Sequence, residues 1–237
     1  MPRGAPFGLA ELASLGVSGQ LAAQYAKTGW LVRLGQGAYA FPGDEVTAHG
    51  AVKFLQQRVP GLHIGGKSAL ALQGVRHNLG DRALLVLWGD GRFVLPPWFA
   101  SRFPAHYVAP RLFDWPGNGR LVELTLTTPP GAVDGLRVST PERAALEMLY
   151  EVGTHQGLEE ARSVFDGLRN VRKDVAGQLL ACCTSVKAVR LFLIWSKETG
   201  LLDGEAMQRE YSPRVGSNAR WMRRLDDGTI LSLKPCG

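Results

Sequence analysis

The chain has 237 residues, of which 45% are hydrophobic and 20% are charged. This composition is that of an ordinary globular protein and excludes wholesale disorder, while the length favours two domains. No uninterrupted apolar run reaches the ~18 residues of a membrane span, which excludes an integral helical membrane protein. The opening MPRGAPFGLAELASLG contains no apolar stretch of signal-peptide length, and the three cysteines include an adjacent pair that suits a disulfide poorly. Both features favour a cytoplasmic protein.

The formal net charge of +6 is unevenly distributed along the chain. Residues 1–45 carry three basic and three acidic side chains, whereas residues 46–130 carry nine basic and four acidic ones. Residues 181–237 again have a basic excess, with nine basic and six acidic side chains. A basic excess of this size is compatible with binding to nucleic acid.

The first predicted unit is a helix–turn–helix followed by a hairpin. Apolar residues recur at helical spacing from Leu9, Ser18 is a candidate N-cap, and Gly35-Gln36-Gly37 has the composition of a tight turn. In chain order, the predicted elements are a helix from Leu9 that ends at Gly16, a helix from Ser18 that ends before Gly29, strands at 30–34 and 38–41, and a linker at 42–44. The linker predicts a first domain of residues 1–45 and a second of residues 46–237.

The second predicted domain begins with alternating helices and strands and ends in helices. Up to residue 138, the pattern predicts helices at 46–59 and 68–73 and strands at 63–64, 83–88, 121–126 and 136–138. Ser139 and Glu142 predict a capping box at the start of a helix that buries Leu146, Leu149 and Tyr150. Helices near 158–165, 175–182 and 186–197, a turn at 226–228 and a last strand at 229–233 are predicted to follow. The predicted fold class is α+β or mixed α/β: an N-terminal winged helix–turn–helix, then a larger α/β domain that ends in several helices.

One face of the second predicted helix carries side chains suited to reading DNA. At about 100° per residue, the packing side holds Val17, Leu21, Ala22 and Tyr25. The other side holds Gln20, Gln24 and Lys27, with the small residues Gly19 and Ala23 beside them. Amide and basic groups can bind base edges in the major groove, and small residues allow a close approach. A helical cap whose exposed face is merely polar remains an alternative.

The stretch GLHIGGKS, residues 61–68, matches the phosphate-loop pattern G-x-x-x-x-G-K-[ST] in full. A phosphate loop follows a buried strand, but here a predicted helix and Pro60 precede Gly61. A strand-to-helix turn with Ser68 as the cap of the next helix is therefore the favoured interpretation. A nucleotide-binding protein that uses Gly66, Lys67 and Ser68 remains an alternative.

Other catalytic and metal-binding patterns are missing from the sequence. The five histidines are scattered without an i,i+4 pair, and no Cys-x-x-Cys or G-x-S-x-G stretch occurs. The sequence therefore predicts no catalytic residue, no metal ligand and no cofactor, and the protein is not expected to be an enzyme.

The sequence resembles the AbiEi-type antitoxins of type IV toxin–antitoxin systems. In the N-terminal winged helix–turn–helix, the resemblance lies in LAELASLGVSGQLAAQYAKTGWLVRLGQGAYAFPGD, above all the Leu-Gly-Val-Ser turn, Gly29-Trp30-Leu31, Arg33-Leu34-Gly35, Gly37, Tyr39 and Pro42-Gly43. It continues through GGKSALALQGVRH, STPERAALEML, CTSVKAVRLFL and DGTILSLKP, so it covers most of the chain.

This resemblance implies a bacterial, DNA-binding transcriptional autorepressor. Such antitoxins bind inverted repeats of double-stranded DNA in their own promoter, and they counter a nucleotidyltransferase-like toxin without needing a direct complex with it. The DNA-binding positions that the resemblance implies here are Ser18, Gly19, Gln20, Gln24 and Lys27 in the helix, with Arg33 and Gln36 in the wing. A protein-interaction module with a degenerate winged helix is a further alternative to this function.

Overall fold

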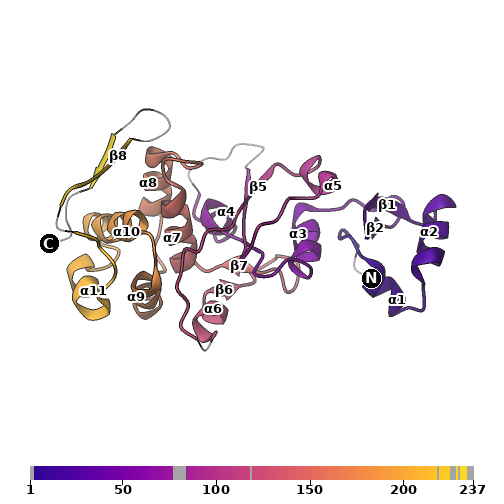
Figure 1. Ribbon diagram of the computed structural model, residues 1–237, viewed down its shortest axis with the longest axis horizontal. Coiled ribbons are helices and arrows are strands. Elements are labelled where there is room, and N and C mark those ends of the chain that lie inside the picture. Colours follow the sequence, from indigo (N-terminus) through magenta and orange to yellow (C-terminus); the bar gives the residue numbers. More distant parts are fainter. Residues whose placement is uncertain are drawn as a thin grey trace.

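The computed structural model describes residues 3–76, 84–117, 119–217, 219–224, 228 and 230–233. The molecule is elongated, and its parts follow one another along the long axis nearly in sequence order (Figure 1). The N-terminal unit lies at one end, a sheet lies in the middle, and a group of helices lies at the other end. The DNA-binding unit predicted from the sequence therefore projects from one end of the molecule.

The N-terminal unit contains α1 (Leu9–Ala13), α2 (Gly19–Lys27), β1 (Val32–Gly35) and β2 (Ala38–Ala40). Each of the four elements lies where the sequence predicted it. Ser18 is the N-cap of α2, and its side-chain oxygen accepts a hydrogen bond from the backbone N–H of Leu21 at 3.2 Å. In the described residues before Leu9, there is no helix; Phe7 instead forms a β-bridge with Tyr39. The hydrophobic core of the N-terminal unit is small and consists of the buried residues Phe7, Leu12, Ala22, Leu31 and Tyr39.

After α3 (Ala48–Gln56), the chain forms a five-stranded mixed sheet with the strand order β5-β4-β3-β7-β6. The strands are β3 (His63–Ile64), β4 (Leu85–Trp88), β5 (Ala105–Val108), β6 (Leu126–Thr127) and β7 (Val138–Ser139). The pairs β3–β4 and β6–β7 are antiparallel, while β3–β7 and β4–β5 are parallel. Three short helices connect them: α4 (Gly66–Leu72), α5 (Pro97–Ala100) and α6 (Arg120–Leu124).

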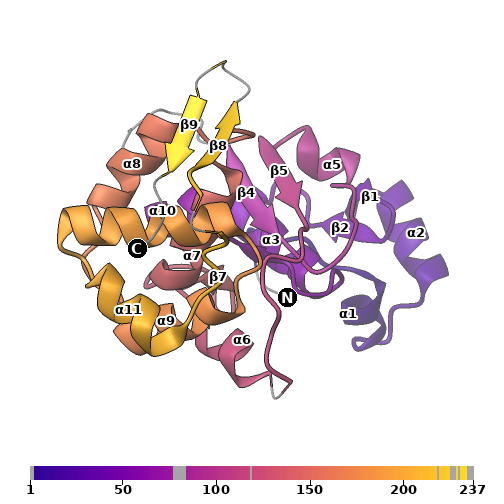
Figure 2. The same ribbon diagram turned by 60° about the vertical axis from the view of Figure 1, so that its left-hand side comes forward.

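The rest of the chain is helical until its final hairpin. The helices are α7 (Pro141–Glu151), α8 (Leu158–Asp166), α9 (Lys173–Cys182), α10 (Val186–Thr199) and α11 (Gly204–Tyr211). The hairpin consists of β8 (Trp221–Arg224) and β9 (Ile230–Leu233), and it projects from these helices (Figure 2). Helix α7 is buried along nearly its whole length and links the sheet to the helical group. The α+β architecture predicted from the sequence is confirmed.

Several local predictions are wrong. Residues 121–126 were expected to form a strand, but residues up to Leu124 belong to α6, which follows Gly119 in a left-handed conformation and buries only Leu121. Ser139 and Glu142 do not form a capping box, because the N-cap of α7 is Thr140 and the carboxylate of Glu142 accepts hydrogen bonds from Arg172. The sequence also gave no indication of α5, β5, α11 and β8. The predicted turn at 226–228 lies largely outside the described residues.

Candidate nucleic-acid interface

The exposed side of α2 is the side that the sequence predicted. Ala22 is completely buried and Tyr25 is half-buried, so this side packs on the core of the unit. Gln20, Gln24 and Lys27 are exposed. The N-terminal positions Ser18 and Gly19, which the family resemblance also implicates, are exposed as well. The helix therefore presents two amides, one ammonium group and a free N-terminal end on one accessible surface.

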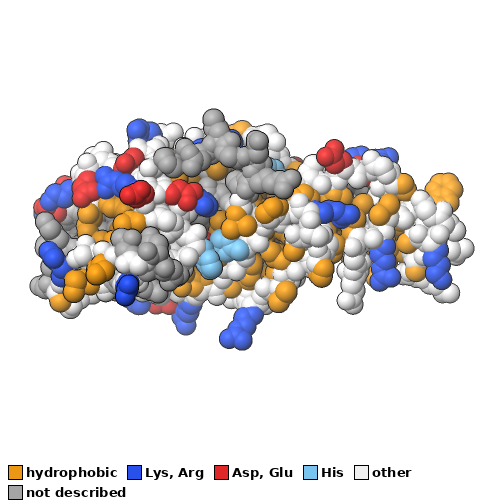
Figure 3. All heavy atoms as spheres, turned by 90° about the horizontal axis from the view of Figure 1, so that it is seen from above, with side chains coloured by type: hydrophobic (Ala, Val, Ile, Leu, Met, Phe, Trp, Pro, Cys, Tyr) orange, Lys and Arg blue, Asp and Glu red, His pale blue; other side chains and the backbone are white. Residues whose placement is uncertain are grey.

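The hairpin of β1 and β2, which is the wing of the N-terminal unit, adds two further polar side chains to this end of the molecule. Arg33 and Gln36 are both exposed, and Gln36 lies in the turn between β1 and β2. Gly37 has a φ of 66°, a conformation that favours glycine and that this tight turn requires. Figure 3 shows Lys and Arg side chains on this end, whereas basic and acidic side chains are mixed over the helices at the opposite end. The side chains of Lys27 and Arg33 make no hydrogen bond or ion pair with another described residue.

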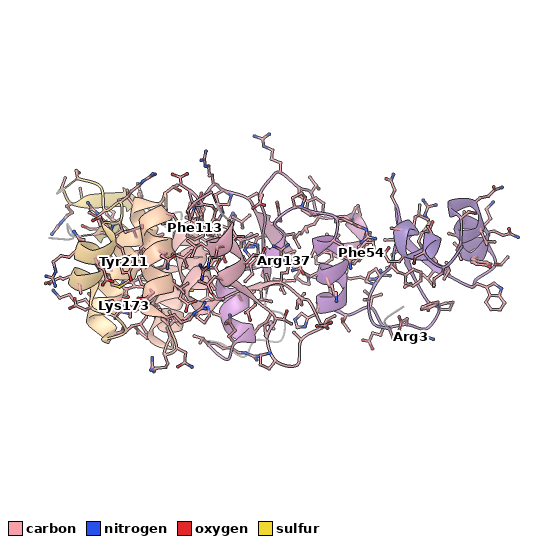
Figure 4. The ribbon with its side chains drawn as sticks, turned by 90° about the horizontal axis from the view of Figure 1, so that it is seen from below. Arg3, Phe54, Phe113, Arg137, Lys173 and Tyr211 are labelled. Atoms are coloured by element: carbon pink, nitrogen blue, oxygen red, sulfur yellow. The ribbon has the colours of Figure 1, made fainter. Side chains whose placement is uncertain are left out.

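The wing also contacts the larger part of the chain, which the sequence analysis did not predict. The backbone of Gly35 lies so close to the indole of Trp98 that a Cβ atom there would be 2.5 Å from the ring. On the other side, the guanidinium of Arg58 pairs with the carboxylate of Glu11 at 2.9 Å and lies 3.6 Å from the centroid of the Phe54 ring. Figure 4 shows Phe54 on α3, between the N-terminal unit and the sheet. The contacts of Trp98 in α5 and of Arg58, which follows α3, thus help to set the orientation of the winged unit.

The phosphate-loop pattern folds into a strand-to-helix turn whose groups are all engaged. Strand β3 lies inside the pattern, and the N–H of Gly66 at the start of α4 donates to the carboxylate of Glu147 at 3.0 Å. The ammonium of Lys67 pairs with Glu160 at 3.0 Å. The hydroxyl of Ser68 accepts from the N–H of Val86 instead of capping the helix, so its predicted capping role is wrong. The N–H of Gly66, which a phosphate loop would direct at a nucleotide, is thus bonded to a carboxylate of the protein itself.

Glu147 is the centre of this buried arrangement. Its carboxylate lies 2.9 Å from Nε2 of His63 and 2.8 Å from both the guanidinium of Arg143 and the hydroxyl of Ser139. Burial acts to raise the pKa of Glu147, but the interactions with His63 and Arg143 and the hydrogen bonds from His63 and the Gly66 N–H outweigh it and lower the pKa to about 2. Because these groups are buried and hydrogen-bonded to Glu147, they join β3, β7, α4 and α7.

The described residues show no sign of a metal or thiol centre. In these ranges, no three His, Cys, Asp or Glu side chains are grouped as metal ligands would be. Burial raises the pKa of Cys182 to about 11 and that of Cys183 to about 12, which leaves both thiols protonated and unreactive at neutral pH. Each helix within the described part of the chain is too short or too polar to span a bilayer.

Two family models together match nearly the whole chain. Residues 1–80 match the N-terminal domain of the AbiEi antitoxin transcriptional regulators, and residues 82–232 match the model described as a transcriptional regulator, AbiEi antitoxin, of type IV toxin–antitoxin systems. The chain belongs to the AbiEi antitoxin family. The resemblance that the sequence suggested is confirmed, and the comparisons give no support to a phosphate-loop enzyme.

A solved structure has the same fold. The RV2827C protein from Mycobacterium tuberculosis aligns over 92% of this chain and 84% of its own, with a TM-score of 0.57 and 16% sequence identity. At this identity the match concerns the fold alone. No curated protein matches the chain. The family therefore identifies this chain as an AbiEi-type transcriptional regulator and antitoxin.

Proposed function

We propose that this AbiEi chain represses its own promoter by inserting α2 into the major groove of inverted repeats. The single observation that supports this is the exposed face of α2, where Gln20, Gln24 and Lys27 have no packing role. Glutamine can form a bidentate pair with adenine, and Lys27 can reach guanine or a phosphate. Ser18 and Gly19 lie at the start of the helix, and Arg33 and Gln36 reach the backbone or the minor groove from the wing.

In this proposal residues 1–45 form the DNA-binding domain and residues 46–237 form the antitoxin domain. The winged unit has no net charge, so phosphate contacts have to come partly from the basic segment 46–130. Arg102 is one example, since it is exposed and lines a depression of about 350 Å³ together with Val32 and Leu34 of β1. The antitoxin domain counters a nucleotidyltransferase-like toxin without a stable complex. The proposal gives the cytoplasmic chain no enzymatic activity and no cofactor.

The experiment measures binding of the full chain to its own upstream DNA and to random DNA over a range of salt concentrations. Gln24→Ala should cost roughly 1–3 kcal/mol at the cognate operator and much less on random DNA, because it removes a base contact. Gln178→Ala is the matched control, since Gln178 is also an exposed glutamine on a helix but belongs to α9, at the other end of the molecule. Equal losses on both DNAs would mean that α2 does not read bases.

A cell-based measurement separates repression from rescue. The triple variant Gln20→Ala, Gln24→Ala, Lys27→Ala should lose repression of a promoter reporter and retain rescue of cells that express the toxin. These side chains are exposed, so each truncation should change the free energy of unfolding by no more than roughly 0.5 kcal/mol. Normal repression at a normal protein level would contradict the assignment of α2. Loss of rescue together with repression would show that both functions use one surface.

A further inference from the structure

A cavity of about 940 Å³ lies between the wing and the larger part of the chain. One wall is the turn Gly35–Gly37, a second is the end of α3 with Phe54 and Arg58, and the third is the segment from Asp90 to Trp98. This volume is in the range of pockets that bind small organic molecules. None of the residues that form it is needed for the proposed base contacts of α2.

The apolar walls of this cavity are aromatic and held in place by their neighbours. Trp98 is 8% exposed and packs edge-on against Phe54, with ring centroids 6.0 Å apart. Phe93 packs edge-on against Tyr107 at 5.5 Å, and the hydroxyl of Tyr107 donates to the carbonyl oxygen of Gly91. These contacts hold the rings of the cavity walls in place. Flat aromatic rings on its walls favour a planar aromatic occupant.

One cation at the cavity mouth is available to bind an anion. The guanidinium of Arg58 is already paired with Glu11. Asp90 also lines the cavity, but its carboxylate is directed against the backbone of Gly61, where a Cβ atom would lie 2.2 Å from one of its oxygens. Arg92 is exposed and has no hydrogen bond or ion pair with another described residue. Its guanidinium is therefore free to bind a carboxylate or sulfonate at the cavity mouth.

We propose that this cavity binds a small planar aromatic anion, and that its occupant lowers the affinity of the winged unit for DNA. The second half rests on the proposed function. Gln36 both lines the cavity and belongs to the proposed wing contacts, so an occupant that holds Gln36 competes with DNA for it. The occupant also touches the larger domain on the opposite wall. Binding at the cavity and binding to DNA are therefore coupled, and the coupling is reciprocal.

The first test uses two fluorescent probes with the full chain. 1-Anilinonaphthalene-8-sulfonate has the rings and the negative charge, whereas N-phenyl-1-naphthylamine has the same rings without the charge. Both should bind with increased fluorescence, and the anionic probe should bind about two- to fivefold more tightly, as expected of one exposed ion pair. Arg92→Gln should abolish this difference. Equal binding of the two probes to the unmodified chain would overturn the assignment of an anion.

The second test fills the cavity. Gly91 lines it, its φ lies outside the left-handed region, and a Cβ atom there would meet no atom within 4 Å. Gly91→Phe should therefore fold normally and weaken binding of the anionic probe by about tenfold or more, because its ring takes the space of the probe. Val94→Phe is the control, since Val94 is 88% exposed in the same segment and does not line the cavity. Equal probe binding by the two variants at equal melting temperature would overturn the site.

The coupling is measured with the promoter DNA and the anionic probe together. Saturating probe should weaken operator binding by about fivefold or more in the unmodified chain and have no effect on Gly91→Phe. Probe binding without any change in operator affinity would overturn the coupling. If the chain failed to bind its operator at all, the proposed function would fail, whereas the two probe titrations would still decide whether the cavity is a binding site.

Discussion

The winged unit and the larger part of the chain differ in how many hydrophobic side chains they bury. The core of the winged unit contains five buried hydrophobic residues, and the unit leaves Leu15 at 66% and Trp30 at 73% exposed. The larger part has one extended core that includes β3, β4, α7, α9 and α10. A unit of about 40 residues buries too little apolar surface to be very stable alone. Its contacts with α3 and α5 therefore belong to its stability as well as to its orientation.

Charged groups show the same contrast. In the larger part, Arg143 and His63 are buried, and each is hydrogen-bonded to the buried carboxylate of Glu147, so these groups hold elements of the fold together. In the winged unit, Lys27 and Arg33 are exposed and make no ion pair with described residues. The buried Arg143–Glu147 pair is committed to the structure, whereas Lys27 and Arg33 remain available to a partner. The predictions below test this contrast, beginning with the largest expected effect.

The largest effect is expected from Glu147→Ala. This change leaves the buried guanidinium of Arg143 without its counter-ion and the N–H of Gly66 without its acceptor. The free energy of unfolding should fall by about 3–5 kcal/mol, as is typical when one partner of a buried pair is removed. Urea denaturation followed by circular dichroism measures it.

The control for this prediction is Glu159→Ala on α8, which removes an exposed carboxylate that has no ion pair in the described chain. Its effect should stay within about 0.5 kcal/mol. Similar small losses in both variants would mean that the buried network does not stabilise the fold.

The free energy of unfolding should also depend on pH through the carboxylate of Glu147. The pKa of Glu147 in the folded chain is lowered from 4.5 to about 2, so the unfolded chain takes up the proton first as the pH falls. The stabilisation is fully present above pH 4.5 and is lost as the pH falls towards 2, in total about 3 kcal/mol. Urea denaturation at several pH values measures this slope. The difference between the unmodified chain and Glu147→Gln should shrink over this range, and a constant difference would contradict the assignment.

The contrast between the two regions also explains which elements the sequence could predict. In the winged unit, the signals are local: Ser18 caps α2, and a glycine-rich turn joins two short strands. Residues there interact with near neighbours in sequence, so all four elements were predicted. In the larger part, Ser139 and Glu142 are a good capping pair by spacing, but their side chains bind Glu147 and Arg172, which are distant or on another element. Local patterns cannot anticipate such partners.

The candidate site follows the same rule. Exposure of Gln20, Gln24 and Lys27 follows from helical periodicity alone, and the structure confirms it. The contact between Gly35 and Trp98 joins residues that are 63 positions apart in sequence, and no periodic pattern indicates it. The match to the phosphate-loop pattern was misleading for the same reason, because the N–H of Gly66 at the start of α4 donates to Glu147 on a later helix. Surfaces could be predicted from one helix, whereas contacts between elements could not.

The next prediction concerns the contact between the two regions. In Gly35→Ala, the new methyl group would lie 2.5 Å from the Trp98 indole, so the wing or α5 has to move. This should cost about 1–3 kcal/mol of stability and weaken operator binding, because the wing changes its orientation. Gly91→Ala is the matched control, since Gly91 lies across the same cavity with open space around it. Thermal unfolding and operator titrations of both variants measure these effects. Equal melting temperatures and operator affinities in the two variants would mean that the contact does not determine the orientation of the wing.

The smallest effect is expected at the start of α2. In Ser18→Ala, the backbone N–H of Leu21 loses its side-chain acceptor, which should cost about 1 kcal/mol. Ser18→Asp supplies another acceptor and places a negative charge at the helix N-terminus, so it should retain the stability of the unmodified chain. Thermal unfolding of the full chain measures both changes.

Operator binding separates the cap of α2 from a direct contact with DNA at the same residue. If Ser18 faces a phosphate, the added carboxylate of Ser18→Asp should repel it, and operator affinity should fall although stability does not. The loss should shrink as salt is raised, because the repulsion between carboxylate and phosphate is screened. If Ser18 is only a cap, Ser18→Asp should bind the operator as the unmodified chain does, and Ser18→Ala should be the weaker binder of the two. The order of the two variants in operator affinity therefore decides whether the start of α2 belongs to the DNA surface or only to the fold of the winged unit.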